Sequence, residues 1–183
     1  RFQACRFGLD GMMVNPKTRE QISIREDILA TLRLLGPHAD ALNAQAALDD
    51  SLRYVKERHA FGKAIGGHQL VQGLLAEMVT DIEASRLLLY RALWMLSSGQ
   101  RCELEAAVAK SFVTEASQRV ASKAIQLHGA FGISKEFSVE RYFRNSRMLT
   151  IPDGTTQINQ LIIGRNLTGL DALYVERAAD VAL

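Results

Sequence analysis

Cysteine, proline and long apolar runs are all scarce in this sequence of 183 residues, which contains two cysteines and three prolines. Cys5 and Cys102 are too few for a disulfide scaffold and form no metal-ligand spacing, so a reducing, cytoplasmic setting is expected. No apolar run reaches transmembrane length and no signal-peptide pattern is present, which predicts a protein without a membrane span. The chain begins with Arg1 rather than Met, as expected for a fragment or a processed chain.

An excess of either charge is also missing. Lys and Arg number 22 and Asp and Glu number 20, for a formal net charge of +2. A nucleic-acid-binding surface would need Lys and Arg concentrated on one face, so no nucleic-acid partner is expected. Hydrophobic residues make up 48% of the chain, enough for one domain with a buried core.

Apolar residues recur at intervals of three and four over most of the chain, which is the pattern of amphipathic helices. Gly36-Pro37 interrupts the first of these stretches, and proline inside a helix costs about 3 kcal/mol, so a kink or break is expected there. Ser138 is the expected N-cap of a short helix, and Gly169 is expected to end the last one. The predicted helices span residues 24–58, 68–98, 103–127, 138–147 and 155–167.

Three long antiparallel helices, with a fourth element formed by the two short ones, predict an all-α, four-helix up-and-down bundle over residues 24–169. Residues 1–23 carry scattered glycines and a proline, and we expect a linker, a loop or the remnant of a preceding β-domain. Residues 170–183 are expected to form a C-terminal tail.

The most distinctive stretch runs from residue 126 to residue 157. Gly129 with Gly132 marks one turn, and Pro152-Asp153-Gly154 marks a second, because Pro fixes φ, Asp bonds the backbone ahead and Gly allows positive φ. Thr155 then opens a helix whose N-terminal amides can receive a polar group.

This stretch resembles the signature of the acyl-CoA dehydrogenase family, in which Q-x-x-G-G-x-G precedes an R-x-x-R-D helix and an E-G-T turn. The matching pieces here are Q-L-H-G-A-F-G (126–132), R-Y-F-R-N (141–145) and D-G-T (153–155). A second family pattern, R-x-x-F-G-x-x-I-x-x-x-Q, stands upstream at 58–69 as R-H-A-F-G-K-A-I-G-G-H-Q. The resemblance covers residues 24–169 and implies the C-terminal helical domain of that family.

By this resemblance, Asp153 occupies the position of the family's catalytic Glu, which removes a proton from the substrate α-carbon. Asp is one methylene shorter, and a misplacement of about 1 Å can cost about 10²-fold in rate. Three possibilities therefore stay open: a site rebuilt around Asp, as in the nitroalkane oxidase branch, a slow enzyme, or an inactive site. A purely structural alternative makes Asp153 a turn former and the N-cap of the last helix.

The resemblance also implies a site for FAD, shared between subunits. Arg58 would meet the pyrophosphate of a neighbouring subunit's FAD, Phe61 its adenine, and Gln69 a position farther along the dinucleotide. A guanidinium pairs well with phosphate and a ring stacks on a base. The structural alternative is a solvated Arg after a helix and a Phe that fastens a loop to the core.

Four further positions complete the implied cofactor site. Gln126 and Gly129 belong to the glycine turn that approaches the other subunit's flavin, although Ala130 replaces the family's second glycine and adds a methyl group there. Thr155 and Gln157 match flavin-contacting groups at a helix N-terminus, and plain helix capping is the alternative for them.

The implied activity is flavin-dependent α,β-desaturation of an acyl thioester carried by coenzyme A or by a carrier protein. The family implies FAD as cofactor, a homodimer or homotetramer, and electron-transfer flavoprotein as electron acceptor. It also places a helical and a β-domain ahead of this bundle, so the chain alone is expected to hold FAD poorly. Two alternatives remain: an inactive helical oligomerisation module, and a flavin oxidase of the nitroalkane oxidase type.

Overall fold

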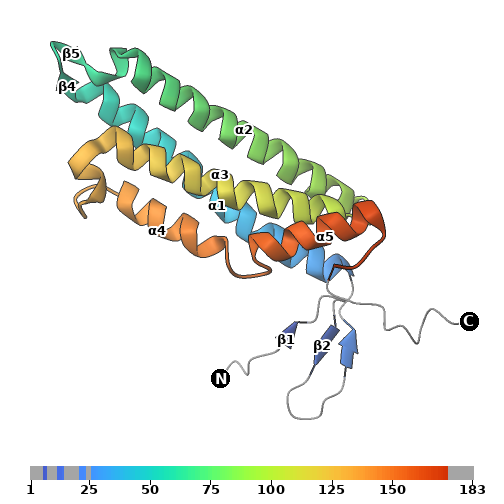
Figure 1. Ribbon diagram of the computed structural model, residues 1–183. Coiled ribbons are helices and arrows are strands. Elements are labelled where there is room, and N and C mark those ends of the chain that lie inside the picture. Colours follow the sequence, from blue (N-terminus) through green and yellow to red (C-terminus); the bar gives the residue numbers. More distant parts are fainter. Residues whose placement is uncertain (1–5, 8–11, 15–20, 24–25, 173–183) are drawn as a thin grey trace, which may run out of the picture.

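The computed structural model describes residues 6–7, 12–14, 21–23 and 26–172, and these are mostly helical (Figure 1). Two short antiparallel sheets and two 3-10 turns accompany the helices. The strands are β1 (Arg6–Phe7), β2 (Met12–Val14), β3 (Gln21–Ser23), β4 (His59–Ala60) and β5 (Lys63–Ala64). The α-helices are α1 (Glu26–Glu57), α2 (Gln69–Ser97), α3 (Glu103–His128), α4 (Val139–Leu149) and α5 (Thr156–Thr168), and the 3-10 turns are η1 (Ile65–Gly67) and η2 (Gly129–Ile133).

Helix α3 is the centre of the bundle, because it packs against α1, α2, α4 and α5. Six of its thirteen buried residues are alanine, and such small side chains let neighbouring helices approach closely. Figure 1 shows α4 and α5 following one another beside α3. The predicted all-α class is therefore confirmed, with five α-helices among the described residues. The four-helix up-and-down arrangement stays a prediction.

The expected break at Gly36-Pro37 is wrong, since α1 is one continuous helix of 32 residues with Pro37 inside it. A kink at the same position stays a prediction. Pro37 is among the fully buried side chains, and α1 packs against both α3 and α4. Tertiary packing along the helix outweighs the hydrogen bond that proline removes.

The ends of the short helices differ in how they are capped. Thr155 is the N-cap of α5, where its Oγ1 accepts a hydrogen bond from the Ile158 amide at 3.3 Å, and Gly169 ends the helix with φ +74°. The alternative in which Asp153 caps this helix is therefore wrong. Ser138 precedes α4 as expected, but its side chain makes no capping hydrogen bond.

Ahead of α1, the short strands β1, β2 and β3 form an antiparallel sheet. The division of the chain at residues 23/24 and 169/170 stays a proposal. Residues 173–183 of the expected tail lie outside the described residues. No helix in the part of the chain that is described has both the length and the apolar character needed to cross a membrane.

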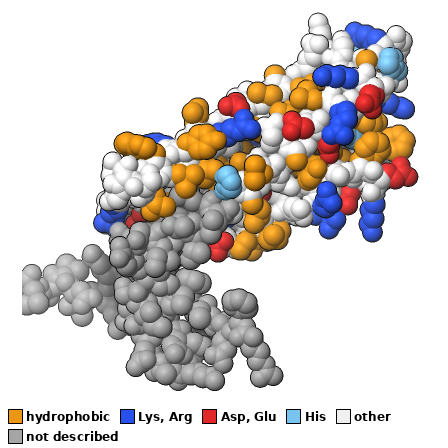
Figure 2. Space-filling model, turned by 180° about the vertical axis from the view of Figure 1, so that it is seen from behind, with side chains coloured by type: hydrophobic (Ala, Val, Ile, Leu, Met, Phe, Trp, Pro, Cys, Tyr) orange, Lys and Arg blue, Asp and Glu red, His pale blue; other side chains and the backbone are white. Residues whose placement is uncertain are grey.

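Large apolar side chains are exposed on the bundle, and Figure 2 shows them scattered among charged groups. Helix α2 carries several of them. They are Leu70, Val79, Leu87, Tyr90, Leu93 and Trp94.

Gly132 is fixed by packing inside the chain. A Cβ atom at this position would lie 2.5 Å from the Ile125 carbonyl oxygen and 2.9 Å from the Ile125 Cα. We expect Gly132→Ala to lower the free energy of unfolding by about 1–3 kcal/mol, because the backbone of η2 must move away from α3. Urea denaturation measures this change.

Gly164→Ala is the matched control, since a Cβ at this position in α5 meets no atom within 4 Å. This substitution should stabilise the chain by about 0.5–1 kcal/mol through the helix propensity of alanine. Equal effects of the two substitutions would contradict the packing role of Gly132.

Candidate functional site

The candidate base lies in the turn between α4 and α5, residues 150–155, which we call the Asp153 turn. Asp153 has φ +56° and Gly154 has φ +93°, so both adopt left-handed backbone, which Asp tolerates better than most residues. The Thr156 amide donates to the Thr150 carbonyl at 3.3 Å and closes the turn. The Asp153 side chain is exposed.

Asn159 of α5 supports the turn from its other side. Its Nδ2 donates to the carbonyl oxygens of Gly154 at 2.8 Å and Thr155 at 3.0 Å. Asn159 is fully buried, so these bonds lie in a region without competing solvent. The turn therefore has a defined shape, and the Asp153 carboxylate is presented to the outside.

Two buried charged residues lie beneath this turn, and the sequence analysis missed both. Lys110 of α3 is 1% exposed, and its Nζ donates to the Leu149 carbonyl at 3.0 Å. Asp40 of α1 is 0% exposed. Lys110 could have been found from the sequence, because it lies between Ala106 and Val113 on the apolar face of a predicted helix, where a buried lysine requires a partner.

Burial raises the pKa of Asp40 to about 8, and the nearby Ser117 hydroxyl and Lys110 ammonium counteract only part of this effect. Neither carboxylate oxygen of Asp40 meets a donor in hydrogen-bonding geometry among the described residues. Burial also lowers the pKa of Lys110, against the opposing charges of Asp40, Asp153 and Glu115. Asp40 is therefore mainly protonated at neutral pH, a state in which the desolvation of a charge is avoided.

Arg58, Phe61 and Gln69 lie close together in sequence around the β4–β5 hairpin at one end of the bundle (Figure 1). All three side chains are exposed, and the Phe61 ring is 94% exposed. Phe61 is not fastened to the core, and its ring contact is an edge contact with His68 at 6.1 Å between centroids. Within the described residues, Arg58 makes no side-chain hydrogen bond or salt bridge.

Gln126 and Gly129 lie at the same end, because α3 ends beside the last turns of α1. Gln126 is exposed, and Gly129 has φ +59° with open space where a Cβ would stand, so its backbone conformation alone requires glycine. Ala130 does not have positive φ, so its methyl group causes no backbone strain.

Thr155 and Gln157 stand with Asp153, at the start of α5. The Thr155 hydroxyl accepts a helix amide, so the capping role expected as an alternative is present. Gln157 is exposed. Two amides at the helix start, those of Thr156 and Ile158, are bonded within the chain, which leaves fewer donors free than the sequence suggested.

The candidate residues thus form two groups on one chain. The turn group, which lies over Lys110, consists of Asp153, Thr155 and Gln157. The hairpin group lies near the end of α3 at His128 and consists of Arg58, Phe61, Gln69, Gln126 and Gly129. Lys110 and His128 are 18 residues apart in one helix, which corresponds to about 27 Å at 1.5 Å per residue. A single small molecule cannot contact both groups of the same chain.

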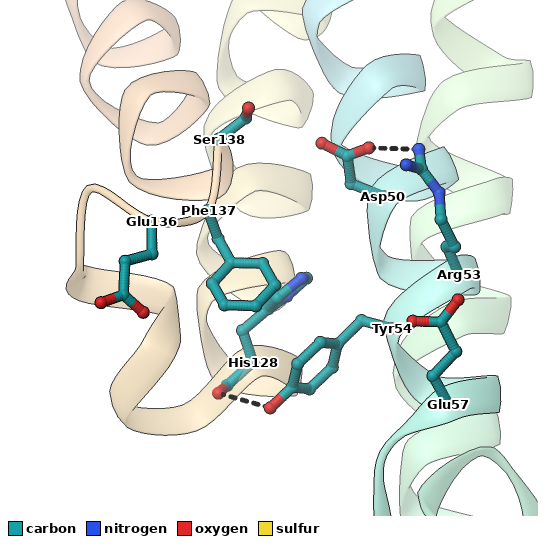
Figure 3. A pocket seen from close by; sticks show the side chains of 8 residues that line it. All are labelled: Asp50, Arg53, Tyr54, Glu57, His128, Glu136, Phe137 and Ser138. Atoms are coloured by element: carbon teal, nitrogen blue, oxygen red, sulfur yellow. Dashed lines mark hydrogen bonds and ion pairs between the residues drawn. The ribbon is translucent and has the colours of Figure 1, made fainter.

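A cavity of about 300 Å³ opens beside the hairpin group, between α1 and the segment that precedes α4 (Figure 3). His128 and Tyr54 form its floor, with rings stacked at 4.2 Å, and the His128 Nδ1 bonds the Ala124 carbonyl at 2.8 Å. Burial lowers the pKa of His128, so a neutral ring with a packing role fits its surroundings. The cavity is lined by Asp50, Arg53, Tyr54, Glu57, His128, Glu136, Phe137 and Ser138.

This cavity does not suit a phosphate-bearing ligand. Three carboxylates line it, those of Asp50, Glu57 and Glu136, against the single guanidinium of Arg53. That guanidinium already pairs with Asp50 at 2.7 Å. In the described part of the chain, no group of three or more His, Cys, Asp or Glu residues could hold a metal ion.

Comparisons with known proteins agree with this architecture. Residues 28–168 match the family described as acyl-CoA dehydrogenase, C-terminal domain. The chain therefore belongs to the acyl-CoA dehydrogenase family, of which it contains the C-terminal helical domain.

Individual relatives carry several activities. The chain is 40% identical over 120 residues to a subunit of the caffeyl-CoA reductase-Etf complex of Acetobacterium woodii, covering 66% of this chain and 32% of that protein. An acyl-CoA dehydrogenase structure from Geobacillus kaustophilus shares 35% identity with a TM-score of 0.75, covering 76% of this chain and 37% of that one. A structure described as PigA with FAD and proline shares 29% identity with a TM-score of 0.75, covering 81% and 41% of the two chains. The chain thus spans about a third of the length of these and other curated relatives.

Proposed function

We propose that this chain is the C-terminal part of an FAD-dependent enzyme that introduces an α,β double bond into an acyl thioester, carried by coenzyme A or by a carrier protein. Asp153 is the base that takes the proton from the α-carbon, so its carboxylate becomes protonated as the substrate is oxidised. Bound FAD would accept the hydride that leaves the β-carbon and so be reduced by two electrons.

One observation carries this proposal. Among the described residues, Phe61 and Asp153 are the non-glycine residues with positive φ, at +52° and +56°. This backbone costs about 1–2 kcal/mol for an ordinary residue, and it is retained where the surrounding structure demands it. Both residues are candidates for function, one to contact a cofactor and one to do the chemistry.

The exposed groups fit FAD chemically. Arg58 offers an uncompensated cation for a pyrophosphate, Phe61 a solvent-facing ring for adenine, and Gln69, Gln126 and Gly129 offer polar and backbone contacts. At the other group, Thr155 and Gln157 stand beside Asp153, where flavin contacts are proposed.

The separation of the two groups supports a cofactor shared by two subunits. Each FAD would meet the turn group of one chain and the hairpin group of another. The exposed apolar side chains of α2 support assembly as a homodimer or homotetramer. The complex named for the A. woodii relative supports electron-transfer flavoprotein as the electron partner.

The physiological direction of the reaction is a separate question, since that relative is named as a reductase. In the reverse direction, protonated Asp153 would return the proton to the α-carbon while hydride adds to the β-carbon. The residues required are the same in both directions.

The test is the visible spectrum of the full-length protein with FAD. Bleaching of the flavin band by a short acyl-CoA, or its recovery when an enoyl-CoA is added to the reduced protein, is the expected result. Bound flavin that never bleaches with any thioester, but consumes oxygen with a nitroalkane, would favour the oxidase alternative. Failure of the full-length protein to bind flavin would favour the oligomerisation module.

Arg58 should contribute strongly to FAD binding. We expect Arg58→Ala in the full-length protein to raise the FAD dissociation constant about 10–100-fold, since a charge-assisted hydrogen bond contributes about 1.5–3 kcal/mol. Flavin fluorescence titration measures this change. Arg53→Ala is the matched control, because Arg53 is an exposed arginine of the same helical region that already pairs with Asp50. Equal losses for both variants would remove Arg58 from the cofactor site.

A further inference from the structure

We propose that two side chains of α3, Lys110 and Glu115, hold the Asp153 turn at both of its ends and thereby position the Asp153 carboxylate for proton transfer. This inference rests on the proposed function, in which Asp153 is the base. Lys110 and Glu115 act through the turn, so they are positioning residues and do not touch the substrate. We call this pair the α3 clamp.

Lys110 holds the entrance of the turn. Its Nζ donates to the carbonyl of Leu149, the last residue of α4, at 3.0 Å. Carbonyls at the end of a helix lack partners in the helix itself, and a cation at this position interacts favourably with the helix dipole. Lys110 is 1% exposed, so water does not compete for this bond.

Glu115 holds the exit of the turn. The hydroxyl of Thr156, the first residue of α5, donates to Glu115 Oε1 at 2.7 Å. Thr156 is 7% exposed, and its amide also closes the turn onto Thr150. The two clamp residues are five apart on α3, about 7.5 Å along the helix axis.

The clamp has an electrostatic side as well. Asp153 and Glu115 are both near enough to Lys110 to oppose the fall in its pKa that burial causes. The lysine therefore holds the residue just before the turn through a hydrogen bond and interacts with the Asp153 carboxylate through space. Because a displacement of about 1 Å can cost about 10²-fold in rate, a rigid attachment of this turn matters for a base as short as Asp.

The test compares Lys110→Met with Lys123→Met in the full-length protein with FAD bound. Methionine keeps the length of the side chain but removes its charge and donor. Lys123 belongs to the same helix but pairs with Glu77 and Asp81 of α2, away from the turn. We expect faster amide hydrogen exchange at residues 150–156 in Lys110→Met, with kcat for acyl-CoA oxidation about 10–100-fold lower and KM nearly unchanged. Lys123→Met should show neither change.

Thr156→Val tests the other end of the clamp if Lys110→Met does not fold. This change removes the hydroxyl that donates a hydrogen bond to Glu115, so it should also speed amide exchange in the turn and lower kcat. Thr156→Ser keeps the hydroxyl and should show the exchange rate and kcat of the wild type. Exchange at residues 150–156 that matches Lys123→Met in both Lys110→Met and Thr156→Val overturns the clamp, whatever the activity of Asp153→Asn. Full activity of Asp153→Asn overturns the proposed function itself, and with it the catalytic purpose of the clamp.

Discussion

Asp153→Asn in the full-length protein should bind FAD normally and lose at least about 10²-fold in the rate of flavin bleaching by an acyl-CoA. Asparagine keeps the size of the side chain but cannot take the α-proton, and general base catalysis contributes about 10²–10⁴-fold. The Asp153 turn should keep its shape, because its hydrogen bonds are made by Thr150, Thr156 and Asn159 and none of them uses the Asp153 carboxylate. Stopped-flow absorbance measures the bleaching rate.

Two further variants complete this experiment. Asp49→Asn, an exposed carboxylate of α1, is the control and should bleach like the wild type. Asp153→Glu keeps a carboxylate one methylene longer, and it should keep a measurable rate well above that of Asp153→Asn. If Asp153→Asn bleaches as fast as the wild type, another group is the base, and Asp153 is a turn residue only.

Asp40→Asn should make the protein more stable than the wild type at pH 8. Burial raises the pKa of Asp40 to about 8, so the folded state keeps a proton that the unfolded state releases near pH 4. Between these values the folded state binds more protons than the unfolded state, and the free energy of unfolding falls as pH rises, by up to about 1.4 kcal/mol per pH unit. Above about pH 8 both states are ionised and this fall ends. Asparagine does not titrate, so the variant lacks this loss.

Denaturant unfolding of both proteins from pH 4 to pH 9 gives the required comparison. The difference curve is needed because His128, whose pKa is lowered by burial, contributes a slope of the opposite sign. Asp49→Asn, which changes an exposed residue of the same helix, should leave the slope unchanged. If Asp40→Asn instead loses several kcal/mol at pH 8, Asp40 is charged in the folded protein and forms an ion pair with Lys110.

The helices were largely predictable because their information is local. Apolar spacing predicts the three long helices, and turn and capping residues predict the two short ones. The ends of α5 agree to within a residue or two, since Thr155 and Gly169 act on their own helix. Pro37 shows the limit of local reasoning. Proline is unfavourable inside a helix, but the packing of α1 against α3 and α4 stabilises the helix enough for it to continue through Pro37.

The two motifs identified the family, and the family was confirmed. Residue types at fixed spacing, such as the R-x-x-F-G stretch, are a property of the sequence, so they can be recognised without a structure. The individual roles of Arg58, Phe61, Gln69, Gln126, Gly129, Thr155, Gln157 and Asp153 stay predictions, which the variants above test.

By itself the sequence determined the helical class, the family and the list of candidate site residues, because periodicity and motif spacing are properties of the chain alone. Tertiary structure alone decided that these candidates separate into two groups about 27 Å apart along α3. It also brought Asp40, Lys110 and Glu115, which are far from Asp153 in sequence, beneath the turn that carries it. Burial sets the charge and the hydrogen bonds of these groups, and burial depends on which helices pack together.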